Sequence, residues 1–394
     1  METDATKTPD AAIRPFRIDI AQAEVDDLRE RLRHTRWPDE LPGAGWDYGI
    51  PLDHVRELAE QWRTEYDWRE HESRLNEFPQ FTSTIDGQNI HFLHVRSHGP
   101  RAIPLLLTHG WPGSVVEFEK VIGPLVDPSA HGADAADAFH VVAPSIPGFA
   151  FSGPTHETGW DVKRVAAAFA QLMNRLGYDR YGAQGGDWGS AISRQLAVLD
   201  PEHVIGLHLN TLAAPPSGDP KEIELLTEKE KSYLDAAQGF RQQGSAYFMI
   251  QSTRPQTLAY ALTDSPTGLL AWIGEKFHEW SDRSSGHSAI EPAQLLTNVS
   301  VYWFTGTANS SARLYFEFAH SGSSWGRVET STVPTGVAVF PREIAPPIRR
   351  FAERSNNIVH WTEFDRGGHF AAMEQPDLLV ADVRAFFRGL RNRL

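Results

Sequence analysis

The sequence predicts an α/β fold in which helices cover both faces of a mostly parallel sheet. Apolar runs of strand length, such as 103–107 (IPLLL) and 204–209, alternate with longer segments of helical periodicity such as 162–176. Runs without polar alternation are typical of strands buried on both faces, as they are in parallel sheets. Between about 212 and 325, helix formers and aromatic residues replace this alternation. We therefore expect a helical segment inserted between two parts of the sheet.

Before the first buried strand, the sequence predicts two helices and a hairpin. Between residues 19 and 36, an amphipathic pattern places Val25, Leu28 and Leu32 on one face of a helix. A second helical stretch runs from about 52 to 68. Alternating apolar residues then flank Asp86-Gly87, a dipeptide that favours a tight turn between two strands at 81–85 and 90–95.

Further segments continue the α/β alternation on both sides of the inserted helices. They are expected strands at 140–143, 180–184, 336–340 and 358–364, and expected helices at 192–199 and 376–390. Because α/β proteins place their sites at the carboxyl edge of the sheet, the inserted helices would form a lid over that edge.

The composition excludes several classes of function. The chain has 394 residues, a formal net charge of −14 and no cysteine. Proteins that bind nucleic acid or anionic membranes concentrate Lys and Arg, so we expect neither partner. Without cysteine there is no disulfide, thiolate metal site or cysteine nucleophile. No other cluster of ligand residues in the sequence suggests a metal or an organic cofactor.

The start of the chain carries no recognisable targeting signal. Its residues METDATKTPDAAIRP are polar with mixed charge and lack the apolar core of a signal peptide. No stretch approaches the roughly 18–20 apolar residues that a membrane-spanning helix needs. We therefore expect a soluble protein of the cytoplasm.

A glycine-rich turn between an expected strand and an expected helix carries the first candidate for chemistry. Gly185-Gly186-Asp187-Trp188-Gly189 has the spacing of a nucleophile elbow, Gly-x-nucleophile-x-Gly, in which glycines permit a sharp turn that exposes one side chain. Here the nucleophile would be Asp187. The alternative is that Asp187 only caps the following helix, since Asp is common at that position.

A second loop favours the interpretation of this turn as a nucleophile elbow. His109-Gly110-Trp111-Pro112-Gly113 directly follows the strand at 103–107, where this type of fold takes one backbone N–H of its oxyanion hole. The residue after the nucleophile supplies the other N–H, so the amides of Trp111 and Trp188 are the candidates. Taken alone, such a loop would be an ordinary turn.

The order nucleophile, acid, histidine predicts the other two members of a triad. His369 lies in a glycine-flanked loop, RGGHF, after the last expected strand. The acid should follow the preceding strand, where Glu343 stands. Asp365 is the competing acid, but it lies only four residues before His369 and would shape the same loop.

An aspartate nucleophile predicts displacement at an sp³ carbon, because an ordinary acyl substrate would leave a labile anhydride. Epoxides and alkyl halides both fit. An epoxide oxygen needs a proton donor as it leaves, so hydroxyl groups in the lid favour epoxides. The alternative for any tyrosine in the lid is that it only packs in the core of the lid. The candidates in the expected lid are Tyr233, Tyr247, Tyr260, Tyr302 and Tyr315.

Long stretches of the chain resemble the microsomal-type epoxide hydrolases, and the resemblance covers nearly its whole length. They are RPFRIDIAQAEVDDLRERLRHTRWP, the loop HGWPGS, the elbow GGDWGS, the lid segment QSTRPQTLAYALTDSPTGLLAWIGEKF, and FPREI followed by RGGHFAAMEQP. The resemblance implies an α/β-hydrolase fold and conversion of an epoxide to a vicinal diol through an ester of the nucleophile. It implies no cofactor and no metal.

The resemblance also assigns roles to individual residues. The family's nucleophile matches Asp187, its acid Glu343 and its base His369. Its two epoxide-polarising tyrosines match Tyr247, in GSAYFMIQ, and Tyr315, in SSARLYFEF. Tyr302 is the alternative for the second tyrosine.

The resemblance implies that the chain is divided into three parts. Residues 1–80 form an N-terminal extension that wraps around the catalytic domain, 81–211 and 326–394 form the catalytic domain, and 212–325 form the lid. The membrane anchor that some family members carry has no counterpart in the sequence, which implies a soluble form.

The substrate would be an apolar or aromatic epoxide contacted by Trp111, Pro112 and Trp188. The alternatives are a haloalkane dehalogenase, which shares the aspartate chemistry, and a non-catalytic ligand-binding protein of the same fold. Detoxification and secondary metabolism are equally compatible roles. The oligomeric state stays open, a homodimer included.

Overall fold

The protein is described from a computed structural model that covers residues 12–99, 101–284, 286, 289–322 and 329–391. The first eleven residues, on which the expectation of no signal peptide rests, lie outside these ranges. So do residues 323–325, the expected end of the lid. No helix in the described part of the chain is long and apolar enough to cross a membrane.

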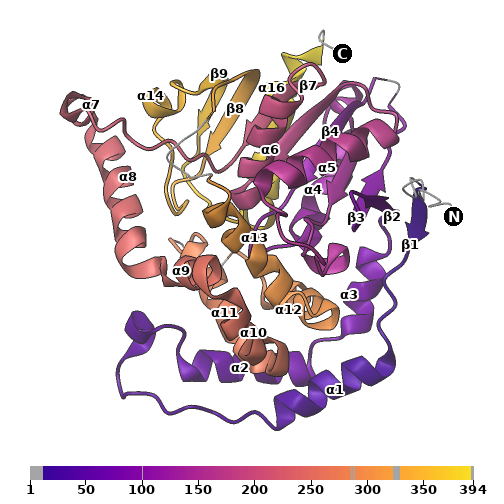
Figure 1. The fold of residues 1–394 in the computed structure, drawn as a ribbon, viewed down its shortest axis with the longest axis vertical. Helices are drawn as coiled ribbons and strands as arrows, with labels where there is room; N and C mark the ends of the chain where they lie inside the picture. Colours follow the sequence, from indigo (N-terminus) through magenta and orange to yellow (C-terminus); the bar gives the residue numbers. More distant parts are fainter. Residues whose placement is uncertain (1–11, 100, 285, 287–288, 323–328, 392–394) are drawn as a thin grey trace, which may run out of the picture.

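A mixed, mostly parallel sheet lies in the upper half of the view in Figure 1 and confirms the predicted fold class. Within the described residues its strand order is β1-β2-β3-β5-β4-β6-β7-β8-β9. Neighbouring strands from β5 to β9 pair in parallel, whereas β1, β2 and β3 pair antiparallel. The strands are β1 (Arg14–Phe16), β2 (Gln80–Ile85), β3 (Gln88–Val95), β4 (Ile103–Thr108), β5 (Phe139–Pro144), β6 (Tyr181–Gly185), β7 (Val204–Leu209), β8 (Ser331–Val339) and β9 (Asn356–Glu363).

Helices cover both faces of this sheet, as the apolar runs predict. In β4, Leu105 and Leu107 pack with helices α4 (Glu119–Val126) and α16 (Pro376–Arg388), whereas Leu106 between them packs with the opposite layer. That second layer consists of α5 (Val162–Arg175) and α6 (Asp187–Leu199). Successive side chains of a strand point to opposite faces, so an unbroken apolar run needs cover on both.

A buried carboxylate ties α16 to the strands that it covers. Asp382 accepts hydrogen bonds from His208 at 2.9 Å, from His360 at 2.8 Å and from the Thr362 hydroxyl at 2.6 Å. Burial opposes its ionisation, but the hydrogen bonds outweigh that cost and lower the pKa of Asp382 to about 2. Asp382 is therefore an ionised anchor inside the sheet's helical layer.

The predicted insertion between β7 and β8 is a set of helices. They are α7 (Pro220–Glu224), α8 (Glu228–Gly239), α9 (Ala246–Thr253), α10 (Pro255–Asp264), α11 (Pro266–Trp280), α12 (Pro292–Thr305) and α13 (Ala308–His320). Pro255, Pro266 and Pro292 each stand at the first turn of a helix, where the missing proline N–H costs nothing. Figure 1 shows most of these helices between the sheet and the N-terminal helices.

The N-terminal segment differs from its expected form in two places. The helix expected at 52–68 ends earlier, as α2 (Leu52–Thr64), and a helix that the sequence did not predict, α3 (Trp68–Leu75), begins after Asp67, whose side chain accepts from the Arg69 amide at 2.9 Å and caps it. The short strand β1, which the sequence did not predict, adds the start of the described chain to the sheet edge. The first helix, α1 (Gln22–Arg33), buries Val25, Leu28 and Leu32 as predicted.

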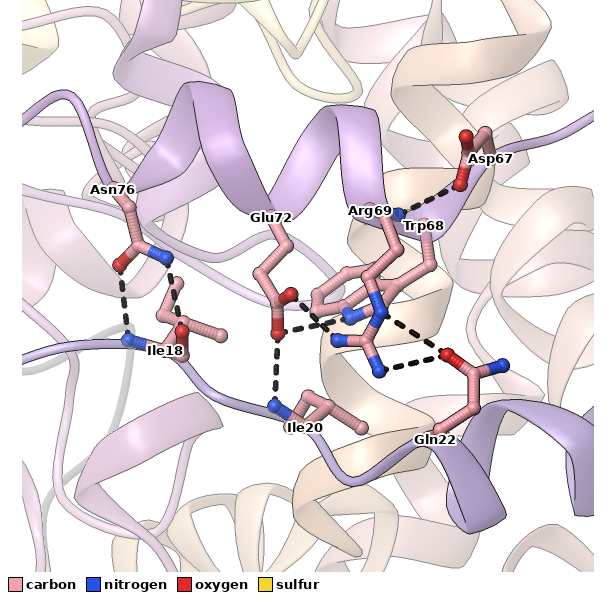
Figure 2. A network of polar contacts seen from close by, with 8 residues as sticks. All are labelled: Ile18, Ile20, Gln22, Asp67, Trp68, Arg69, Glu72 and Asn76. Carbon is pink, nitrogen blue, oxygen red and sulfur yellow. Dashed lines mark hydrogen bonds and ion pairs between the residues drawn. The ribbon is translucent and has the colours of Figure 1, made fainter.

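Polar contacts tie the chain before α1 back onto α3 (Figure 2). Asn76 accepts from the Ile18 amide and donates to the Ile18 carbonyl, both at 2.9 Å. Glu72 accepts from the Ile20 amide at 2.8 Å and pairs with Arg69 at 2.6 Å. Helices α1 and α2 then pack against lid helix α11. The N-terminal segment thus contacts both the sheet and the lid.

Candidate active site

The predicted elbow joins β6 to α6 and holds Asp187 in a left-handed conformation with φ of 50°. Such a φ strains any residue but glycine and is typical of a nucleophile at a sharp turn. The flanking glycines are required because a Cβ on Gly185 would collide with the Gly189 backbone, and one on Gly189 would collide with the Thr108 carbonyl. The cap position of α6 is held by Gly186, and the Asp187 carboxylate faces the Trp111 amide and His369 instead. The alternative that Asp187 only caps a helix is therefore not supported.

The loop after β4 holds one oxygen of this carboxylate. The Trp111 amide donates to Asp187 Oδ1 at 2.8 Å, as expected of an oxyanion-hole donor beside the nucleophile. A Cβ on Gly110 would overlap the Asp187 side chain, so the loop can approach this closely only with glycine there. Trp188 follows Asp187 at the start of α6, and its ring is fully buried.

The predicted base and acid converge on the nucleophile from the ends of two further strands. His369 follows β9, and its Nδ1 lies 2.6 Å from Oε1 of Glu343, which follows β8. Its Nε2 faces Asp187 Oδ2 at 3.4 Å. Asp365, the competing acid, is exposed and pairs with Arg366 instead. The structure therefore brings Asp187, His369 and Glu343 together and leaves Asp365 outside.

The electrostatics of this group favour a charged imidazole. Burial alone would lower the pKa of His369, but the carboxylates of Glu343 and Asp187 outweigh it and raise that pKa well above its ordinary value. Glu343 is itself held by the Thr211 hydroxyl at 2.6 Å and the Ile344 amide at 2.8 Å. Since Nδ1 faces Glu343, Nε2 is the nitrogen that faces the nucleophile.

Two of the lid tyrosines pack against Trp111, in the loop after β4. The Tyr247 ring, on α9, stacks on Trp111 with centroids 5.0 Å apart, and the Tyr315 ring, on α13, meets Trp111 edge-on at 5.8 Å. Burial, reinforced by the charge of Asp187, raises the pKa of both tyrosines above the ordinary value. Both hydroxyls therefore keep their protons and can donate hydrogen bonds.

The other lid tyrosines lie elsewhere. Tyr302 donates from its hydroxyl to the Gly113 carbonyl at 2.8 Å, so it supports the loop after β4. Tyr260 is exposed. Tyr233 lies on α8, where Lys229 approaches its ring. Of the two candidates for the second polarising tyrosine, Tyr315 is the one beside Tyr247, with centroids 5.9 Å apart.

Aromatic rings surround the group formed by the nucleophile and the two tyrosines. The Trp188 ring lies edge-on to Tyr315 at 4.7 Å, and Trp280 lies 5.3 Å from Tyr247 and 5.1 Å from His369. Rings of this kind provide apolar surface around a few polar groups, as small-molecule sites do. No group of His, Asp and Glu side chains in the described residues has the arrangement of a metal site.

Several supporting residues escaped the sequence analysis. The end of α11 and the segment after it hold the His369 loop: the Trp280 carbonyl accepts from the His369 amide at 2.9 Å, and the Asp282 side chain accepts from the Gly367 amide at 2.7 Å. Glu374 accepts from the Asp282 amide at 2.7 Å. These contacts join segments that lie about 85 residues or more apart in the chain, and no local sequence motif predicts them.

Glu117 is a further residue that no motif singled out. It lies in a short 3-10 helix after the HGWPG loop, and its carboxyl packs against Gly113, where a Cβ would overlap it. Burial raises the pKa of Glu117 to about 8, with His369 opposing the shift and Asp187 adding to it. An acidic residue within the apolar run VVEF was the available signal.

Comparison with known proteins agrees with this geometry. A family model described as the epoxide hydrolase N terminus matches residues 13–118, and a model of the alpha/beta hydrolase fold matches residues 103–376. A putative epoxide hydrolase of Stigmatella aurantiaca is 49% identical, covering 97% of this chain and 86% of its own. Epoxide hydrolase 1 of Sus scrofa is 36% identical, covering 98% and 90%.

Solved structures show the same similarity. The epoxide hydrolase of Aspergillus niger superposes with a TM-score of 0.86 at 34% identity and covers 97% of each chain. The juvenile hormone epoxide hydrolase of the silkworm Bombyx mori superposes with a TM-score of 0.88 at 32% identity, covering 100% of this chain and 98% of its own. The match includes both the N-terminal segment and the lid.

Proposed function

The chain belongs to the epoxide hydrolases of the α/β-hydrolase fold, and from this premise we propose how its own residues convert an epoxide and water to a vicinal diol. The observation that carries the proposal is the position of one carboxylate. Asp187 stands on a strained turn, its Oδ1 held by the Trp111 amide and its Oδ2 facing His369. Tyr247 and Tyr315 supply two protonated hydroxyls nearby.

In the first step, an Asp187 oxygen attacks one ring carbon from the side opposite the breaking C–O bond. The electron pair of that bond moves to the epoxide oxygen, which accepts hydrogen bonds and then a proton from the Tyr247 and Tyr315 pair. The product is a hydroxyalkyl ester of Asp187. Tyrosines of raised pKa hold their protons until an alkoxide forms, and an alkoxide is basic enough to take one.

In the second step, His369 takes a proton from water, and the resulting hydroxide attacks the carbonyl carbon of the Asp187 ester. The amides of Trp111 and Trp188 hold the oxyanion, and Glu343 stabilises the imidazolium. Collapse of this intermediate expels the diol, whose departing ester oxygen takes the proton from the His369 imidazolium. The second proton of the water, left on the Asp187 carboxyl, returns to the tyrosinate formed in the first step. Water has then replaced one oxygen of the Asp187 carboxylate, and the site is regenerated.

Esterification also explains how one histidine can serve as the base. In the free enzyme the Asp187 carboxylate helps to raise the pKa of His369. The ester carries no charge, so that contribution disappears when the intermediate forms. The pKa of His369 then falls, and the imidazole is better able to accept a proton from water when one is needed.

The proposal extends to the substrate and to the organisation of the chain. We infer an apolar or aromatic epoxide that lies against Trp111, Pro112 and Trp188. We also infer the division into an extension (1–80), a catalytic domain (81–211 and 326–394) and a lid (212–325). A cytoplasmic location and a homodimer stay predictions, to be checked by cell fractionation and by light scattering.

One turnover in heavy-oxygen water tests the covalent route. With enzyme in excess over a styrene-oxide-like epoxide, the first diol should carry no label, because its new oxygen comes from Asp187. Direct incorporation of solvent oxygen in that turnover would refute the ester. Incubation with a bromoalkane is the matched comparison: release of halide in the absence of diol from the epoxide would favour dehalogenation.

A further inference from the structure

A small cavity borders both the nucleophile and the predicted base. Its volume is about 20 Å³, and Asp187, His369, Glu117 and Thr108 are among the residues that line it. A cavity needs roughly 10–15 Å³ and two to four polar partners to hold one water molecule. This cavity therefore fits a single water next to both the carboxylate and the imidazole.

The Thr108 hydroxyl gives independent support for a water at this place. Thr108 ends β4, is 1% exposed, and its Oγ1 has no hydrogen-bond partner within the described part of the chain. A buried hydroxyl without a partner costs roughly 1–3 kcal/mol, so such groups are normally paired with protein or with ordered water. A water in the adjoining cavity would satisfy it.

Glu117 supplies a second polar group to the same cavity. Its carboxyl is attached to the loop that carries Trp111, and the mechanism proposed above gives it no role. Because burial raises the pKa of Glu117 to about 8, the carboxyl is mostly protonated at neutral pH. A neutral carboxyl offers one donor and an acceptor oxygen, and it does not compete with His369 for the proton of water.

We propose that Glu117 and Thr108 hold the water that hydrolyses the Asp187 ester, and that this cavity is its site. The assignment rests on the proposed function. Both are positioning residues: they orient the water so that one of its protons points to His369 Nε2 and its oxygen to the ester carbon. The proton goes to His369 and the new C–O bond forms at Asp187, with no other reactant needed. Ring opening does not use this water.

Separation of the two chemical steps tests the proposal. Rapid mixing with quenching and intact-protein mass spectrometry measures how fast the ester forms and how fast it disappears. Glu117→Leu keeps the approximate size of the side chain and removes its hydrogen bonds. Its ester should form at the wild-type rate and hydrolyse at least about tenfold more slowly, since misplacing a reactant by about 1 Å can cost about a hundredfold. In the steady state, kcat and KM should fall together.

Two further variants separate a role in catalysis from a role in folding. Thr108→Val removes a hydroxyl that has no protein partner, so stability should be unchanged while ester hydrolysis slows severalfold or more. Glu117→Gln keeps a donor and an acceptor and should recover most of the hydrolysis rate. Glu119→Leu is the matched control, because Glu119 is also a largely buried acid but faces Arg74 and Lys120. In Glu119→Leu, ester formation and ester hydrolysis should both keep the wild-type rates.

The outcomes distinguish this proposal from the one on which it rests. Wild-type ester hydrolysis in both Glu117→Leu and Thr108→Val would overturn the water site. So would equal slowing of both steps, which would indicate a structural role. If no ester forms in the wild type or in any variant, the covalent mechanism itself fails, and the water site fails with it.

Discussion

Replacement of His369 by glutamine should stop the reaction halfway. Glutamine is close to histidine in size and can still donate a hydrogen bond toward Glu343, which lies 2.6 Å from His369 Nδ1. It cannot take a proton from water. Ring opening uses Asp187 and the two tyrosines and needs no base, so we expect the ester to form at a rate within about tenfold of wild type.

The size of the effect on the second step follows from the geometry. His369 Nε2 lies 3.4 Å from Asp187 Oδ2, which leaves it within one water molecule of the carbon that is attacked. A general base so placed contributes about 10²–10⁴ in rate, or roughly 3–5 kcal/mol of barrier. The hydrolysis rate of the His369→Gln ester should fall by that factor, so that nearly all of the enzyme becomes alkylated under turnover.

Intact-protein mass spectrometry is the assay. After mixing with excess epoxide, His369→Gln should gain the mass of one substrate, and peptide mapping should place it on Asp187. Asp187→Asn in the same background is the control and should gain nothing. Diol production at the wild-type rate by His369→Gln, or an adduct that survives Asp187→Asn, would refute this reasoning.

Three further predictions concern the tyrosines, the triad acid and the buried anchor of α16. Phenylalanine at both Tyr247 and Tyr315 should abolish ester formation while leaving the thermal unfolding curve unchanged; diol formation at the wild-type rate would reject their assignment as proton donors. Glu343→Gln removes a charge that raises the pKa of His369, so the pKa of His369 should fall. The acid limb of the pH profile for ester hydrolysis should then move to lower pH, and that step should slow by about 10²-fold or more. Stopped-flow measurements across pH check the direction, and a shift of the acid limb to higher pH would contradict it. Asp382→Asn should lower the free energy of unfolding at pH 7 by roughly 2.6 kcal/mol, because the carboxyl has a pKa of about 2 in the folded protein against about 3.9 in the unfolded chain. This stabilisation is fully present above about pH 4 and is lost as pH falls through about 2. The difference in free energy of unfolding between wild type and Asp382→Asn, measured by urea unfolding, should therefore narrow at acid pH. A difference that stays constant with pH would contradict the role of the ionised Asp382.

Much of this protein follows from local sequence. The apolar run at 103–107 and the Asp86-Gly87 turn act over a few residues, and the strand and the hairpin that they predict appear in the structure, as do the inserted helices predicted from the helix formers of 212–325. The elbow is equally local, because Gly185 and Gly189 permit the turn at which Asp187 stands. The order of nucleophile, acid and histidine then narrowed the search to Glu343 and His369 among many acids and histidines.

The choice between similar residues required tertiary structure. The order of strands favoured Glu343 over Asp365 as the triad acid, and the contacts of the folded chain decide it, because Glu343 meets His369 whereas Asp365 is exposed and pairs with Arg366. Tyr302 and Tyr315 are separated by 13 residues on two different helices. Which of them faces Asp187 depends on how α12 and α13 pack on the loop after β4, and no periodicity in the sequence encodes that packing.

Short-range patterns in the chain specify the fold class, the elbow and the kind of chemistry. The fold class follows from apolar runs that alternate with helical periods, the turn from glycines around the nucleophile, and the chemistry from an aspartate at that position. Tertiary structure alone decided which groups surround the nucleophile. Glu117, Thr108 and the lid contacts to the His369 loop come from segments that meet only in the folded chain. A burial-dependent property such as the raised pKa of Glu117 exists only there, because it is set by the removal of water around the carboxyl.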